Sequence, residues 1–350
     1  MRSTYRNIFL IFGLVAIGAM LYGFGVDFSD IRDRMAAAGM YLPAVIGVWV
    51  VVYAFNACAF QTIVNSGNHG KRLAYRHAYK LTVSGFAFSY TTPFGFGGLP
   101  YRIMELSAHI GAAGAISATT LYSMMHILSH FCLWATALPL FLALHWELMS
   151  PLLWTFFGIF AVVLMVVFYF FNYGYKNGMV VKLYRLLFYV PIVSKYARRF
   201  YDRHVAAMEE TDRNIAALHS RPRAFYSSLS MEYVGRVVNS LEFFFILRAL
   251  GIPIGFGDAL IVLAFSSLVG NMLFFFPMQL GAREGSLAAI VSMLGFASPG
   301  VGLFASFYTR VRELFWIFVG VGLVKVGNKS IMQHTNTNIN QHKPIKINQP

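Results

Sequence analysis

The sequence predicts an all-α polytopic membrane protein with about six spanning helices plus two re-entrant broken hairpins, arranged as a partial inverted repeat. Composition is the first reason. Of 350 residues, 57% are hydrophobic and 12% are charged, which is about half the charged fraction of a soluble domain. The second reason is a series of long apolar runs, and the third is the clustering of basic residues between those runs.

Six apolar runs are long enough to cross about 30 Å of hydrocarbon. Four of them are almost free of charge, whereas the last two contain embedded charges. The first run follows Arg2 and Arg6, and we expect it to be a retained helix because no small-residue cleavage site follows it. The six predicted spans are 8–26, 40–64, 116–144, 151–171, 226–250 and 301–325.

Two further apolar regions, 79–112 and 258–296, are interrupted by helix-breaking residues. The first contains TTPFGFGGLP and the second contains FPMQLGAREG. Proline and clustered glycine cannot continue a helix, so each region is expected to form two half-helices. The predicted breakers are Pro93, Pro100, Pro277, Gly281 and Gly285.

Lysine and arginine predict the orientation. The stretch 175–224 carries ten of them against four acids, and the stretch 65–80 carries four, whereas 145–150 and 251–258 carry none. The positive-inside rule therefore places both termini, 65–80 and 175–224 in the cytoplasm. The net charge of +14 is explained in this way, and nucleic-acid binding is not expected.

Six full spans with both termini on one side require each broken region to return to the face that it left. The order of helix, broken hairpin and helix then occurs twice with opposite orientation, an architecture common among transporters. The alternative is eight ordinary spans with two Pro/Gly kinks. We expect 175–224 to be an interfacial segment or a linker between the halves, and the polar tail 328–350 to be disordered.

Both breaks place an arginine beside glycines. In the first, Gly97 and Gly98 precede Arg102. In the second, Arg283 and Glu284 follow Gly281. An unwound backbone within the bilayer is tolerated where it lines a cavity, and a helix N-terminus with a nearby arginine favours an anion. We interpret these segments as a headgroup or phosphate site; the alternative is a turn with interfacial arginines.

The embedded charges suggest pairs within one helix. Glu232 and Arg236 are four residues apart, and Arg310 and Glu313 are three apart, so each pair shares a helix face. His126 and His130 also share a face, which we expect to be hydrogen-bonded rather than metal-binding, because no third ligand accompanies them. We expect no metal and no cofactor. No Walker, GxSxG or Cys/His metal motif occurs, so no catalytic residue is proposed and an enzyme is not expected.

The two broken motifs resemble the flippase-like transmembrane domain of bacterial lysylphosphatidylglycerol synthases, a family with stand-alone members that lack the synthase domain. The resemblance covers roughly residues 8–327, so we treat 1–327 as one transmembrane domain. Two departures stand out: Leu99 replaces an acid, which leaves Glu105 as the nearest one, and Ser123, Met124 and His126 replace an acid–arginine pair. The matching residues are Pro93, Gly97, Gly98, Arg102, Pro277, Gly281, Glu284, Gly285, Tyr308 and Arg310.

The resemblance implies a protein of the bacterial cytoplasmic membrane that moves an anionic or aminoacylated phospholipid between leaflets. Membrane lipids are then its partners, an oligomer is compatible with this reading, and no cytosolic aminoacyltransferase domain is present in this sequence. The alternatives are a membrane enzyme or accessory subunit that presents a lipid carrier to a glycosyl- or aminoacyl-transferase, and a small-solute carrier. The candidate substrate-binding residues are Gly97, Gly98, Arg102, Glu105, Arg283, Glu284 and Arg310.

Overall fold

A computed structural model describes residues 39–67, 72–92, 97–177, 222–272, 282–296 and 301–324, with scattered residues between 181 and 213. All regular elements within these ranges are helical. They are α3 (Tyr41–Ser66), α4 (Tyr75–Thr91), α5 (Gly98–Ile110), α6 (Ala112–Leu144), the short 3₁₀ helix η2 (Trp146–Leu148), α7 (Pro151–Asn177), α10 (Pro222–Ala249), α11 (Phe256–Met272), α12 (Ala282–Met293) and α13 (Val301–Leu323).

Three of these helices are long and apolar enough to span a membrane: α3, α6 and the part of α7 from Pro151 to Phe171. Three such helices indicate a multi-pass membrane protein. α10 and α13 are of similar length but carry the embedded charges. The predicted span 8–26 and the tail 328–350 lie outside the described residues, as does much of 175–224.

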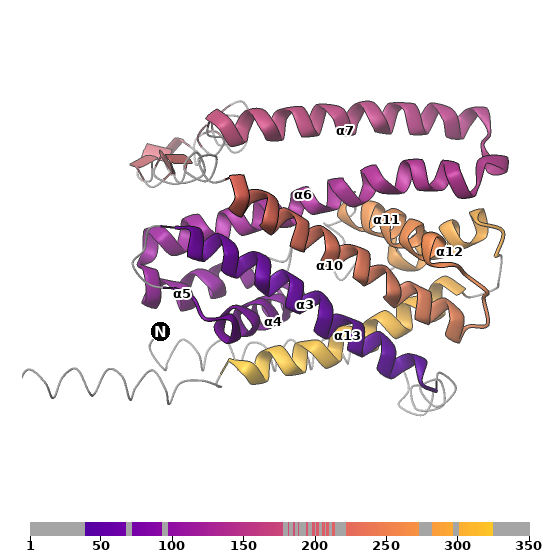
Figure 1. The fold of residues 1–350 in the computed structure, drawn as a ribbon, viewed down its shortest axis with the longest axis horizontal. Helices are drawn as coiled ribbons and strands as arrows, with labels where there is room; N and C mark the ends of the chain where they lie inside the picture. The colour runs from indigo at the N-terminus through magenta and orange to yellow at the C-terminus, as the bar shows by residue number, and fades with distance from the viewer. Residues whose placement is uncertain are drawn as a thin grey trace, which may run out of the picture.

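Each broken region forms two short helices, as the sequence predicted. The first gives α4 and α5, and the second gives α11 and α12. α3 ends and α6 begins at the left of Figure 1, so the segment containing α4 and α5 leaves and returns to the same end of the bundle. α10 ends and α13 begins at the right, so the segment containing α11 and α12 does the same from the opposite end.

The packing of the helices repeats between the two halves. When α3, α4, α5 and α6 are matched with α10, α11, α12 and α13, the principal contacts correspond: α4 packs on α13 as α11 packs on α6, and α5 packs on α6 as α12 packs on α13. The first helices of the two sets, α3 and α10, pack side by side and run in opposite directions (Figure 1).

Close packing within the hairpins depends on glycine. A Cβ on Gly98 would overlap the backbone of Gly85 in α4, and a Cβ on Gly302 would overlap the backbone of Glu284 in α12. The ends of α10 and α12 also need glycine, since Gly251 and Gly295 have φ of 77° and 83°, the left-handed conformation typical of a helix C-terminus.

Two apolar cores lie at opposite ends of the bundle. One is built from α4, α5 and the adjacent ends of α3 and α6, around Phe60, Phe88 and Leu106. The other is built from α11, α12 and the opposite end of α6 with parts of α10 and α13, around Leu133, Ile246 and Leu287. Two smaller clusters, around Ile317 and Trp316, pack α13 against α4 and α3. Because the two large cores lie at the ends, much of the middle of the long helices is left for the polar side chains described next.

Helix α7 contributes little to the two cores, with Leu164 as its buried member of the second one. It lies along α6 at the edge of the bundle (Figure 1). Only 6% of the residues in its most apolar stretch are buried. Leu152, Ile159 and Met165 are among its exposed side chains. An apolar helix with so little buried surface is suited to lipid rather than water.

Candidate functional site: a charged cavity at the middle of the bundle

A cavity of about 780 Å³ lies between the two apolar cores. The middle sections of α3, α6, α10 and α13 line it, together with α4, α11, the first residues of α5 and the first turn of α12. Both hairpins therefore reach the same space. This volume is within the range typical of small-ligand sites, and its walls combine aromatic rings with charged side chains.

The described lining contains one more arginine than carboxylate, an unusual amount of charge for the interior of a membrane helix bundle. The arginines come from α5, α10, α12 and α13, and the carboxylates come from α10 and α13. The charged lining residues are Arg102, Arg236, Arg283, Arg312, Glu232, Glu242 and Glu313.

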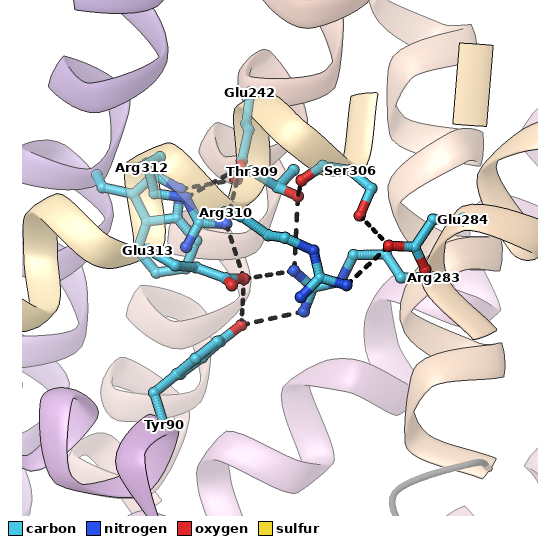
Figure 2. A network of polar contacts seen from close by, with 10 residues as sticks. Tyr90, Glu242, Arg283, Glu284, Ser306, Thr309, Arg310, Arg312 and Glu313 are labelled. Carbon is cyan, nitrogen blue, oxygen red and sulfur yellow. Dashed lines mark hydrogen bonds and ion pairs between the residues drawn. The ribbon is translucent and has the colours of Figure 1, made fainter. Parts of the chain in front are cut away.

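An alternating chain of ion pairs joins α12, α13 and α10 (Figure 2). Arg283 Nη1 donates to Glu313 Oε1 at 2.6 Å, and Arg312 Nη2 lies 3.7 Å from the same oxygen. Arg312 also donates to Glu242 Oε1 from Nη2 at 2.7 Å and from Nε at 3.0 Å. Each carboxylate in this chain therefore has at least one arginine, which compensates the burial of both charges.

Two aromatic residues from the first half hold this chain in place. Tyr90 of α4 donates its hydroxyl to Glu313 at 2.6 Å. Trp49 of α3 donates Nε1 to Glu242 at 2.7 Å, and its ring lies 4.0 Å from the Arg312 guanidinium carbon. That distance gives a cation–π contact. The ionic chain of the second half is thus anchored to the first half.

A second polar cluster connects α6 with α10, and it corrects the expected pair of Glu232 and Arg236. His126 Nδ1 lies 2.8 Å from Glu232 Oε2. Arg236 instead donates to Ser129 Oγ at 2.5 Å and to the backbone oxygen of His126 at 2.8 Å. The two residues do share a face, as their spacing required, but α6 offers each of them a separate partner.

The expected pair of Arg310 and Glu313 is likewise not formed. Arg310 Nη2 donates to Glu284 Oε1 at 2.7 Å, and Ser306 donates to the same oxygen (Figure 2). Arg283 and Glu284 therefore have separate partners on α13. The pairs cross between helices because α12 packs directly on α13. Arg310 and Glu284 are not among the residues that line the cavity.

The Arg102 side chain passes over Gly85 of α4 to reach the cavity. Its Nε lies 3.4 Å from Leu81 O and its Nη2 lies 3.5 Å from Thr82 O. Its guanidinium is 5.1 Å from the centre of the Tyr122 ring. A Cβ on Gly85 would overlap that guanidinium, so the absence of a side chain at Gly85 makes room for Arg102.

The remaining candidate residues of the first motif have other surroundings. Gly97 and Gly98 pack against α4 and do not line the cavity, whereas the neighbouring Leu99 and Pro100 do. Glu105 is buried outside the lining. Pro100 lies in the first turn of α5, where a proline needs no hydrogen-bond partner.

In the second motif, Gly285 lies in the first turn of α12 with open space around its Cα. The breakers Pro93, Pro277 and Gly281 lie outside the described residues.

Several buried polar atoms around the cavity have no hydrogen-bond partner among the described residues. They include Arg312 Nη1, Glu232 Oε1 and Asn239 Oδ1, all on residues of the lining. Buried polar groups are normally satisfied by protein or by water. Donors and acceptors left open around one cavity are expected where a polar ligand or ordered water belongs. Among the described residues, no group of three His, Cys, Asp or Glu side chains could hold a metal ion.

Some of the described residues that line the cavity are exposed, chiefly at the middle of α6. Ile127 is 52% exposed, the His126 side chain is 42% exposed, and Leu99 at the start of α5 is 40% exposed. Asn271 at the end of α11 is also exposed and lines the cavity. These residues lie near the inner ends of both hairpins, about halfway along the bundle.

A small apolar groove of about 90 Å³ lies next to the cavity, between α6, α7, α11 and α12. Phe141, Phe157 and Leu268 are among its lining residues. One hydrogen bond marks the boundary: Trp134, which lines the groove, donates Nε1 at 2.9 Å to Ser267, which lines the cavity. A polar space and an apolar space are therefore adjacent.

The sequence did not single out Trp49 or Tyr90, because one aromatic residue among 17% aromatic residues carries no distinguishing signal. Glu242 and Arg312 were visible only as charges within apolar runs. Their position within a predicted span was the available signal, since charge at that depth is retained for pairing or function.

Comparison with known proteins gives one match. A family model described as the lysylphosphatidylglycerol synthase TM region matches residues 10–322. Neither the search of curated proteins nor the search of solved structures found a match.

Proposed function

Because this chain belongs to the lysylphosphatidylglycerol synthase TM region family, we propose that it binds a phospholipid headgroup in its central cavity and moves the lipid between leaflets. The headgroup, anionic or aminoacylated, would occupy the charged space between the two halves. The observation that carries this proposal is the position of that cavity: charged, about 780 Å³ in volume, and halfway along the long helices.

The proposed orientation follows from the charge distribution. The basic segments 65–80 and 175–224 are placed in the cytoplasm. The segment containing α4 and α5 then enters the membrane from the cytoplasm, and the segment containing α11 and α12 enters from the opposite face. In support, the two segments start from opposite ends of the bundle (Figure 1). Six full spans with both termini in the cytoplasm complete the proposed topology.

The exposed residues at the middle of α6 support a lipid rather than a small solute. A lipid must keep its acyl chains in hydrocarbon while its headgroup crosses a polar path. A cavity whose described lining is exposed at His126 and Ile127 suits such a ligand. The adjoining apolar groove at the Trp134–Ser267 contact offers a surface on which a chain can lie.

Leaflet exchange in vesicles tests the proposal. The purified chain is reconstituted with a fluorescent phospholipid, and the fraction of the label that an impermeant quencher reaches is followed in time. The variant Ser123→Trp puts a large ring into the cavity wall, and Val162→Trp puts the same ring on the exposed face of α7. We expect exchange in the wild type and in Val162→Trp, and exchange at least tenfold slower in Ser123→Trp.

Two results would contradict translocation. One is exchange no faster than in protein-free vesicles, and the other is equal exchange in the two tryptophan variants. If purified protein retains lipid without exchanging it between leaflets, the alternative function is favoured. The cavity would then present a lipid carrier to a membrane-bound transferase.

A further inference from the structure

The carboxylates that line the cavity are buried, whereas two of its arginines, Arg102 and Arg236, are partly exposed. Its three carboxylates are Glu232, Glu242 and Glu313, and their side chains are only 1%, 1% and 3% exposed. Each lies behind a partner: His126 covers Glu232, and arginines cover the other two. A ligand that enters this space finds no accessible carboxylate among the described lining residues.

The four arginines divide into two kinds. Arg283 and Arg312 belong to the ionic chain with Glu313 and Glu242, so their charge is already neutralised within the protein. Arg102 and Arg236 lie within salt-bridge distance of no described carboxylate. Arg102 contacts backbone oxygens and the ring of Tyr122, and Arg236 contacts Ser129 and a backbone oxygen. Both side chains are partly exposed.

These two arginines flank one short stretch of α6. Arg102 stacks on Tyr122 at 5.1 Å, the rings of Tyr122 and His126 are 6.0 Å apart, and Arg236 donates to the backbone oxygen of His126. The two guanidinium groups therefore approach the same face of α6 from α5 and from α10. An arginine has five N–H donors in a planar fork that matches phosphate oxygens, and neither arginine uses its Nη1 group on a described residue.

We propose that the cavity binds a lipid of net negative charge through its phosphate, held between Arg102 and Arg236, and discriminates against a lipid whose headgroup carries an added ammonium group. This inference rests on the proposed lipid-binding function and narrows it to one class of ligand. The reason is electrostatic. A phosphate gains two charge-assisted contacts, whereas an ammonium group at the same depth would meet more arginines than carboxylates, and those carboxylates are buried behind their partners.

A binding experiment that does not depend on transport tests this inference. The full chain in detergent is titrated with three lipids of identical short acyl chains: phosphatidylglycerol, phosphatidylethanolamine and lysyl-phosphatidylglycerol. Bound lipid is counted by native mass spectrometry. We expect phosphatidylglycerol to bind at least tenfold more tightly than lysyl-phosphatidylglycerol. Arg102→Gln and Arg236→Gln should each weaken phosphatidylglycerol binding about tenfold, and Arg102→Lys, which keeps the charge, should weaken it less.

The matched control is Arg76→Gln, which removes one positive charge from an exposed position at the start of α4 outside the cavity. It should bind all three lipids as the wild type does. Equal or tighter binding of lysyl-phosphatidylglycerol would overturn the inference and leave the proposed lipid function standing. So would unchanged binding in both glutamine variants, provided that their thermal unfolding matches the wild type. Failure to bind any of the three lipids would overturn both proposals.

Discussion

Arg283 at the start of α12 and Glu313 in the middle of α13 form an ion pair of 2.6 Å in which the two side chains are 13% and 3% exposed. The two residues are thirty positions apart in the chain, yet their side chains meet where α12 packs on α13. Tyr90 of α4 donates to the same carboxylate. One contact therefore joins the inner end of the second hairpin to a long helix and to a helix of the first hairpin.

Loss of that carboxylate should destabilise the bundle. In Glu313→Gln, Arg283 loses its ion pair with Glu313, and Arg312 retains its ion pair with Glu242. Breaking a buried ion pair from one side costs about 3–5 kcal/mol, so we expect a clear fall in the thermal unfolding midpoint in detergent. Glu147→Gln is the control because its side chain is 71% exposed, and it should unfold like the wild type. Equal midpoints in the two variants would contradict the role assigned to Glu313.

Gly85→Ala should displace the Arg102 side chain while leaving its charge unchanged. The added methyl group would lie 2.9 Å from Arg102 Cζ, and the guanidinium, at the end of a flexible side chain, can move away. We therefore expect a change in unfolding free energy below about 1 kcal/mol but weaker binding of phosphatidylglycerol. Gly158→Ala on α7, with nothing within 4 Å, should change neither quantity appreciably. Wild-type lipid binding in Gly85→Ala would show that the position of Arg102 is immaterial.

A glycine in contact with rigid atoms should behave differently. A Cβ on Gly302 would overlap the backbone oxygen of Glu284 and would lie 2.9 Å from the backbone nitrogen of Ala288. Because backbone atoms cannot move aside, Gly302→Ala should separate α12 from α13 and destabilise the protein by about 1–3 kcal/mol. Gly322→Ala on the same helix has open space and serves as the control. The measurement is thermal unfolding in detergent, and equal stability of the two variants would argue against the close packing of α12 on α13.

Cysteine labelling tests the proposed orientation. Cys58 and Cys132, the two native cysteines, are first replaced by alanine, and single cysteines are then introduced at the exposed positions Ala74 and Ser150. We expect an impermeant thiol reagent to label Ser150→Cys in intact cells and Ala74→Cys only after lysis, because the positive-inside rule predicts that the basic segment 65–80 is cytoplasmic. Labelling of both positions from one side would contradict the inverted arrangement.

Hydropathy and helix breakers were sufficient to place the described helices. The predicted spans 40–64 and 226–250 correspond to α3, Tyr41–Ser66, and α10, Pro222–Ala249. Prolines and glycines marked where each broken region divides into two short helices. These signals are local: an apolar run must be helical in a bilayer because its amides have no other partner, and proline combined with clustered glycine disfavours a continuous helix, whereas the single Pro139 lies inside α6.

The pairing of charges could not be read in the same way. Spacing along one helix brought Glu232 and Arg236 to one face and Arg310 close to Glu313, but it could not show that α6 and α12 would supply His126 and Glu284 as partners instead. The periodicity of a helix shows which side chains share a face, but it does not identify the helix that packs against that face.

The sequence by itself determined that this chain is a membrane helix bundle, where its helices break, and which charges lie within apolar runs. Only the tertiary structure decided which of those charges form ion pairs and which arginines have no salt bridge to a described carboxylate. The physical reason is that the cost of burying a charge depends on distances of a few ångströms between atoms of different helices. Those distances are fixed by packing contacts such as Gly85 with Arg102 and Gly302 with Glu284.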